Sequence, residues 1–234
     1  MLYVSIAFAV LCLVAVGVFL AWRTKQANAK SLMAKTVASV FFILMAVVSL
    51  FVPGNVQTKI LFVFGLVCGL IGDIILDLKV MYPADGQKYL NFGTLMFGIG
   101  HLCYLAGVLI LVLPYQVTGF WWMTGSALAL SFALAAVIQV MSPKLKLDMT
   151  GFKWQSILYS AELTFMMLIS ICLSLVFPIM WILAAGFTLF LASDLVLSMQ
   201  YFGGKQDSKV LTIVNHVLYY LAQVLIAGFL IFIW

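Results

Sequence analysis

The sequence predicts an all-α integral membrane protein, a bundle of eight transmembrane helices that forms a single domain over residues 1-234. Hydrophobic residues make up 66% of the chain, charged residues only 8%, and the mean hydropathy is +1.22. These values exclude an ordinary water-soluble domain, in which about a quarter of the residues are charged. An α-helix needs about 20 mostly apolar residues to cross a bilayer. The chain contains eight such stretches, which are Tyr3–Trp22, Thr36–Val52, Ile60–Leu78, Phe92–Leu113, Phe120–Met141, Trp154–Phe177, Ile179–Met199 and Val210–Trp234.

The first stretch has the position of a secretory signal but not its pattern. It has no basic segment in front of it, it is longer than the apolar core of a signal peptide, and its positive charges follow it. We therefore expect a retained helix. Ala27-Asn28-Ala29 is compatible with a cleavage site, so removal of this stretch is the alternative.

Lysine and arginine are distributed unevenly over the loops between the stretches. Eleven of the 12 basic residues fall in alternate loops, and Lys59 is the exception. The positive-inside rule then predicts that both termini are extracytoplasmic and that the four basic loops are cytoplasmic. The net charge of +5 fits this orientation and attraction to anionic membrane lipids, so no nucleic-acid partner is expected. The basic residues of these loops are Arg23, Lys25, Lys30, Lys35, Lys79, Lys88, Lys144, Lys146, Lys153, Lys205 and Lys209.

Four of the seven acidic residues lie inside apolar stretches, where ionisable groups are costly and their default interpretation is functional. Asp73 and Asp194 lie a turn or more inside their helices, and we expect both to be functional. Asp77 is four residues from Asp73 and beside Lys79, which favours a solvated helix end. Glu162 is open to either a functional role or a structural pairing.

Polar residues of the fourth and eighth stretches lie at helical spacing, three or four residues apart, and therefore share helix faces. A rise of 1.5 Å per residue places these groups and the acids roughly 7–15 Å from the cytoplasmic helix ends. Five helices thus contribute to one layer, which predicts a site in the cytoplasmic half. The residues that we expect to bind a substrate there are His101, Tyr104, Asn215, Tyr219, Tyr220 and Gln223; His216 lies beside them without an assigned role.

The composition of this layer limits its chemistry. A catalytic zinc site usually has three protein ligands and is rich in histidine, but the chain has two histidines and no HExxH motif. There is no GxSxG nucleophile motif and no Gly-rich phosphate loop. We therefore expect no metal and no cofactor. Two carboxyl groups remain, and such a pair can divide the roles of acid and base.

Two groups of residues resemble the signatures of the YhhN-type lysoplasmalogenases. The first consists of Gly65-Leu66-Val67, Gly72-Asp73 and Gly93-x3-Phe97-x3-His101-x2-Tyr104. The second consists of Ser193-Asp194-Leu195 and Tyr219-Tyr220-x-Ala222-Gln223-x-Leu225-Ile226-Ala227. Together these blocks span Gly65–Ala106 and Gly186–Ala227, in the order and helix context of the family. The stretch Lys79–Tyr89 departs from the family as a comparatively long loop.

The resemblance implies an eight-helix membrane hydrolase that cleaves the vinyl ether bond of lysoplasmalogens, the lysoplasmenyl ethanolamine and choline lipids. The products would be a fatty aldehyde and a glycerophospho-base. The family's two aspartates correspond to Asp73 and Asp194, which would act as general acid and base in an order that the sequence leaves open. Asp77, Glu162 and His216 do not belong to the pattern.

The expected partners are a lysophospholipid substrate and membrane lipids, and no obligate protein partner is evident. We expect a multi-pass protein of the bacterial cytoplasmic membrane, with the endoplasmic reticulum as the alternative. The competing function is a proton-coupled transporter of lipids or small molecules, because buried carboxylates and histidines also form proton relays.

Overall fold

The computed structural model describes residues 1–233, which form eight helices long and apolar enough to span a membrane and contain no β-strand. This confirms the predicted all-α membrane fold. Trp234, the predicted end of the last helix, lies outside the described residues. The chain divides into two compact units, one formed by Met1–Pro114 with the C-terminal segment from Gln223, the other by Tyr115–Ala222.

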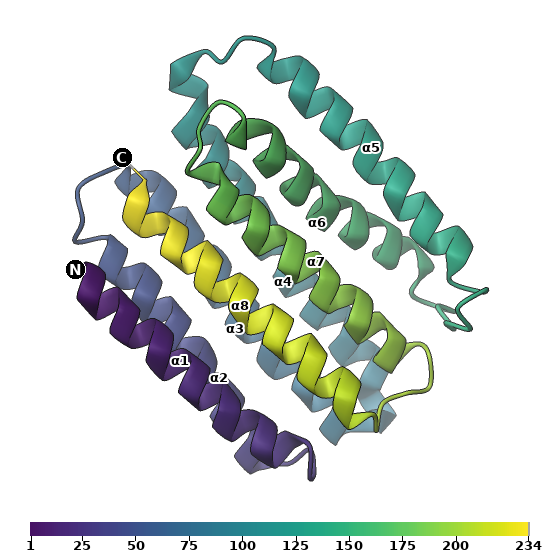
Figure 1. Cartoon of the computed structure of the whole chain (residues 1–234). Helices are drawn as coiled ribbons and strands as arrows, with labels where there is room; N and C mark the ends of the chain where they lie inside the picture. The colour runs from purple at the N-terminus through teal and green to yellow at the C-terminus, as the bar shows by residue number, and fades with distance from the viewer. Residues whose placement is uncertain (234) are drawn as a thin grey trace. The chain divides into compact units, whose positions relative to one another are not determined.

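The first unit contains four complete helices and the last turns of a fifth. Each of the four packs on the next in chain order. The first helix begins, and the last one ends, at the same end of this unit (Figure 1). The helices are α1 (Leu2–Arg23), α2 (Ala29–Ser49), α3 (Val56–Met81), α4 (Gly86–Val112) and the end of α8 (Lys209–Phe232).

Glycines allow α3 and α4 to pack closely. A Cβ atom at Gly100 would lie 2.9 Å from the carbonyl oxygen of Gly65. A Cβ atom at Gly65 would in turn overlap the ring of Tyr104. Only glycine permits this separation of the two backbones, so the pair fixes α3, and with it Asp73, against α4.

The second unit contains three complete helices and the first part of α8. α5 packs on α6, and α6 packs on α7. A short 3-10 turn, Leu113–Tyr115, leads into it from α4. The three helices are α5 (Phe120–Met141), α6 (Lys153–Ser174) and α7 (Met180–Tyr201).

The second helix begins seven residues before the predicted start at Thr36. Asn28 caps it: its side chain accepts from the backbone N–H of Ser31, and the Ser31 hydroxyl accepts from the backbone N–H of Asn28. This reciprocal capping box satisfies N–H groups that a helix start leaves unpaired. Lys30 and Lys35 therefore lie within α2, and their assignment to a loop was wrong.

The connection after α3 is also shorter than predicted. We expected Lys79–Tyr89 to be a long loop. Instead α3 continues to Met81, a 3-10 turn covers Pro83–Asp85, and α4 begins at Gly86. The apolar pattern missed these turns because Lys79 interrupts the apolar stretch of α3, and because the first turn of α4 is polar.

Lys59, the basic residue outside the four basic loops, is fully buried in the first unit. Its Nζ donates to the carbonyl oxygens of Ser49 (3.0 Å), Val52 (2.8 Å) and Pro53 (3.3 Å). The last carbonyl groups of a helix have no partner within the helix, and Lys59 supplies donors at the end of α2. Its charge therefore has a structural role at this position.

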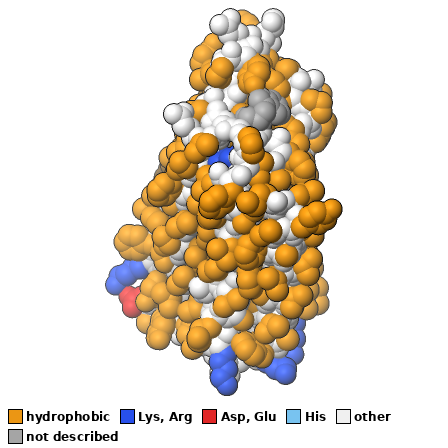
Figure 2. Space-filling model, turned by 90° about the vertical axis from the view of Figure 1, so that its left-hand side faces the viewer, with side chains coloured by type: hydrophobic (Ala, Val, Ile, Leu, Met, Phe, Trp, Pro, Cys, Tyr) orange, Lys and Arg blue, Asp and Glu red, His pale blue; other side chains and the backbone are white. Residues whose placement is uncertain are grey.

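The outer surface of the protein suits a lipid environment. Hydrophobic side chains cover most of the face drawn in Figure 2. Trp121, Trp122 and Trp154, near the starts of α5 and α6, are exposed by 74%, 85% and 76%. Tryptophan is enriched where helix ends meet the membrane–water interface. We conclude that this is a multi-pass membrane protein.

Candidate active site

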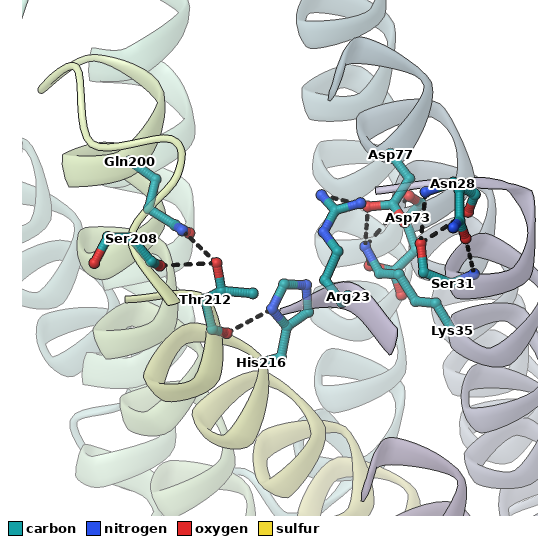
Figure 3. A network of polar contacts seen from close by, with 10 residues as sticks. All are labelled: Arg23, Asn28, Ser31, Lys35, Asp73, Asp77, Gln200, Ser208, Thr212 and His216. Carbon is teal, nitrogen blue, oxygen red and sulfur yellow. Dashed lines mark hydrogen bonds and ion pairs between the residues drawn. The ribbon is translucent and has the colours of Figure 1, made fainter. Parts of the chain in front are cut away.

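Asp73 lies on α3 within a buried polar network of the first unit (Figure 3). The ammonium group of Lys35 is 3.1 Å from its Oδ1, and the hydroxyl of Ser39 donates to its Oδ2 at 3.1 Å. The Lys35 Nζ also donates to the main-chain oxygen of Asp73 at 3.4 Å. Both carboxyl oxygens of Asp73 thus face a donor from α2.

Asp77 lies one turn further along α3 and is also buried, with 2% of its surface exposed. Its Oδ1 is 3.3 Å from the Lys35 ammonium and 3.5 Å from the guanidinium of Arg23. The predicted solvated helix end is therefore wrong. The charge pairing with α1 and α2 brings this carboxylate into the interior instead.

The start of α2 explains why these groups meet. Once Asn28 caps the helix, Ser31, Lys35 and Ser39 follow at intervals of four and share one face, and all three are buried. That face carries the lysine and the serine that contact Asp73. The hydropathy pattern did not single out Lys35 and Ser39 as site residues, although the Asn28-x-x-Ser31 pattern was a signal for the earlier helix start.

Asp194 lies on α7 in the second unit and is half-buried. The hydroxyl of Tyr159, on α6, donates to its Oδ2 at 2.6 Å. This short bond joins a phenol and a carboxyl group within membrane-spanning helices, where polar groups have few alternative partners. Nothing in the sequence pattern singled out Tyr159, because the pairing is between helices 35 residues apart.

Asn215 joins α8 to α7 beside Asp194. Its Nδ2 donates to the main-chain oxygen of Ser193 at 2.9 Å and to the Ser193 Oγ at 3.1 Å. The Ser193 hydroxyl donates back to the main-chain oxygen of Asn215 at 3.1 Å. We call this pair the Ser193–Asn215 clasp. The side-chain amide expected to bind substrate is thus engaged in holding the helix segment that carries Asp194.

A second contact between α7 and α8 lies two turns from the clasp. The Gln200 Nε2 donates to the Thr212 hydroxyl at 2.9 Å. The Nδ1 of His216 is 2.7 Å from the main-chain oxygen of Thr212, within the same helix (Figure 3). His216, which had no assigned role, is therefore bound to its own helix through Nδ1.

The other predicted binding residues are buried, and they are divided between the two units. In the first unit, His101 and Tyr104 lie on α4 with ring centroids 6.3 Å apart. Tyr104 also packs on Phe62, at 5.0 Å between centroids. Gln223, 1% exposed, has no hydrogen-bond partner for its amide atoms among residues 1–233.

Tyr219 and Tyr220 lie on the part of α8 that belongs to the second unit. Their rings contact edge to face at 5.2 Å, and Tyr219 contacts Phe190 of α7 in the same way at 5.4 Å. Asp73, His101, Tyr104 and Gln223 thus belong to one unit, and Asp194, Asn215, Tyr219 and Tyr220 to the other. Within residues 1–233, no group of three or more His, Cys, Asp or Glu residues is arranged to hold a metal ion.

The comparison with protein families matches the chain over most of its length. The family model described as YhhN family covers residues 30–230, which include α2 to α7 and nearly all of α8. No curated protein and no solved structure matches the chain. On this evidence, and in agreement with the two sequence signatures, the chain belongs to the YhhN family.

Proposed function

We propose that this protein is a membrane hydrolase that cleaves the vinyl ether bond of lysoplasmalogens, releasing a fatty aldehyde and a glycerophospho-base. Membership of the YhhN family and the transmembrane helical fold support a hydrolase acting on membrane lipids. The observation that carries the proposal is Asp73, a carboxyl group buried in a membrane helix and held on both oxygens by donors of α2. Asp194 supplies the second carboxyl group.

Vinyl ether hydrolysis needs an acid and a base. The acid donates a proton to the alkene carbon remote from the ether oxygen, and the π electrons form the new C–H bond. Positive charge is then shared between the second carbon and the ether oxygen. The oxygen of a water molecule attacks that carbon while the base removes a proton from the water, which gives a hemiacetal. The C–O bond to glycerol then breaks, the glycerol oxygen is protonated, and the hemiacetal O–H loses its proton as the aldehyde forms.

A pair of carboxyl groups is suited to this sequence. Glycoside hydrolysis passes through a similar oxocarbenium-like transition state, and there one carboxylic acid donates a proton while a second carboxylate stabilises the cation or activates water. In the proposed reaction Asp73 and Asp194 take these two parts. The glycerol and phosphate groups are assigned to the side chains of α4 and α8 outside the clasp, and the hydrocarbon chain to the apolar helix faces. These side chains are His101, Tyr104, Tyr219, Tyr220 and Gln223.

The proposed location of the reaction is the cytoplasmic half of a bacterial cytoplasmic membrane. Eleven basic residues lie in or beside alternate connections, which supports this orientation through the positive-inside rule. Lys35 and Arg23 contact the buried Asp77, and the other nine support the same orientation without them. The orientation is tested by cysteine labelling from either side of the membrane.

The test of function is product analysis with purified protein. Lysophospholipids with a vinyl ether, an ester or an alkyl ether at the same position are incubated and the products identified by mass. We expect aldehyde only from the vinyl ether lipid. Asp73→Asn and Asp194→Asn should each lower aldehyde release by about 100-fold or more, as expected for loss of a general acid or base. Because both groups serve one reaction, the double variant should lose little more than either single variant.

A proton-coupled transporter is the second candidate, and the buried row of charges in α1, α2 and α3 favours it, since such groups also form proton relays. Liposomes containing the protein separate the two functions. Substrate-dependent proton flux without a chemical product would contradict the hydrolase and support transport.

A further inference from the structure

Four charged side chains of the first unit form a row in which the sign alternates. In order they are Arg23, Asp77, Lys35 and Asp73, joined by contacts of 3.5, 3.3 and 3.1 Å. All four side chains are at most 10% exposed. Two cations and two carboxylates make the row neutral, which is the condition under which charges can remain ionised away from water.

We propose that Lys35 is a positioning residue that holds Asp73 as a carboxylate, which makes Asp73 the base of the reaction and leaves the proton-donating role to Asp194. The inference rests on the proposed function and extends it to the order of acid and base. It also assigns a role to a lysine outside the two family signatures.

The geometry at Asp73 carries this assignment. A lysine ammonium has three donors and no acceptor. A proton on Oδ1 would therefore point at a group that cannot accept it, whereas an ionised Oδ1 accepts a charge-assisted hydrogen bond. The Ser39 hydroxyl occupies Oδ2 in the same way. The arrangement at both oxygens thus favours the form of Asp73 that can take a proton from water.

Arg23 completes the arrangement through Asp77. Without the guanidinium, the single ammonium of Lys35 would face two carboxylates, and one of the two would be favoured to take up a proton because like charges repel. With Arg23 beside Asp77, each carboxylate has its own cation. Asp73 can then remain ionised in the substrate-free protein.

The assignment gives a closed proton cycle. The protonated Asp194 donates to the alkene carbon and becomes a carboxylate, held by the Tyr159 hydroxyl. Asp73 takes a proton from the attacking water. On collapse of the hemiacetal, the proton on Asp73 goes to the glycerol oxygen, and the hemiacetal O–H proton goes to Asp194. Both groups end as they began, and the net reaction consumes one water.

Infrared difference spectroscopy of the purified protein at neutral pH tests the charge states directly, because protonated carboxyl groups have a C=O stretch apart from the carboxylate bands. We expect that Asp194→Asn removes a protonated band from the wild-type spectrum and that Asp73→Asn does not. In Lys35→Met we expect a new protonated band, which adding Asp73→Asn removes. Aldehyde release should fall by about 100-fold or more in Lys35→Met and be partly restored in Lys35→Arg.

Two lysine variants serve as controls. Lys59→Met removes another buried lysine, and Lys88→Met an exposed one that pairs with Asp85 at 2.8 Å. Neither should produce a new protonated band. A wild-type band that disappears in Asp73→Asn, a Lys35→Met spectrum without a new band, or a new band removed by Asp77→Asn would each overturn the inference. If Lys35→Met does not fold, the wild-type, Asp73→Asn and Asp194→Asn spectra still decide it.

Failure of the inference is distinguishable from failure of the proposed function. If the wild-type protein cleaves vinyl ether lipids but the spectra contradict the charge states, the hydrolase stands and the order of acid and base is wrong. If the spectra agree but no aldehyde forms, the lysine holds a carboxylate that serves a different function, and the catalytic assignment falls.

Discussion

The Ser193–Asn215 clasp predicts the stability of three variants quantitatively. It contains three hydrogen bonds between α7 and α8. Ser193→Ala removes the two that involve the serine hydroxyl, and Asn215→Leu removes the two that involve the asparagine amide. One bond, from the amide to the hydroxyl, is common to both. The double variant therefore loses three bonds and not four.

Hydrogen bonds between membrane helices contribute about 0.6 kcal/mol each on average. We therefore expect each single variant to lower the free energy of unfolding by about 1.2 kcal/mol and the double variant by about 1.8 kcal/mol. The difference from additivity is about 0.6 kcal/mol, the contribution of the shared bond. Reversible unfolding by sodium dodecyl sulfate in mixed micelles, followed by circular dichroism, measures these values.

Ser198→Ala is the matched control on the same helix, because its hydroxyl donates only to the Leu195 carbonyl within α7. It should leave stability unchanged. Additive losses in the double variant, or no loss in Asn215→Leu, would refute the clasp. A raised KM for Asn215→Leu at unchanged stability would instead support the substrate-binding role that the sequence predicted.

Two further predictions concern the first unit. Lys59→Met removes a donor from the carbonyl oxygens of Ser49, Val52 and Pro53. The Ser49 oxygen keeps the backbone N–H of Val52 and the contacts to Val52 and Pro53 are part-buried, so each lost bond costs about 1 kcal/mol. Relief of the buried ammonium offsets part of this loss, and we expect a net loss of about 1–2 kcal/mol in the same unfolding assay; an unchanged or raised stability would contradict the capping role. Gly100→Ala places a Cβ atom 2.9 Å from the Gly65 oxygen and should cost about 1–3 kcal/mol, whereas Gly17→Ala, with no neighbouring atom within 4 Å, should cost nothing. Equal stabilities for these two glycine variants would show that α3 and α4 do not need their close approach.

The fold could be predicted because transmembrane helices follow from hydropathy and length alone. The same criterion failed at the ends of helices. Lys35 was placed in a loop because the first turns of α2 are polar, yet Asn28 and Ser31 cap the helix and carry Lys35 two turns into it. Polar turns extend a membrane helix beyond its apolar stretch, and hydropathy does not detect them.

Of the candidate site, the two aspartates could be predicted from the sequence, but the residues that contact them could not. Asp73 and Asp194 stand out because single acids in apolar stretches are rare. Their partners do not stand out. Tyr159 and Ser39 are ordinary residues of membrane helices, and only the packing of α6 on α7 and of α2 on α3 selects them. Asp77 was misjudged because Arg23 and Lys35, which contact its carboxylate, belong to other helices and are far from it in the sequence.

The row from Arg23 to Asp73 is poorly explained by stability. Replacing a buried ion pair with well-packed apolar residues is often neutral or stabilising, since the attraction between the charges scarcely exceeds the cost of removing them from water. Stability alone therefore gives no reason for four charges buried together in this row. A requirement for an ionised carboxylate does, because only a neighbouring cation keeps Asp73 charged away from water. Arg23 then follows as the cation that pairs with Asp77, which leaves Lys35 available for Asp73 and keeps the row neutral.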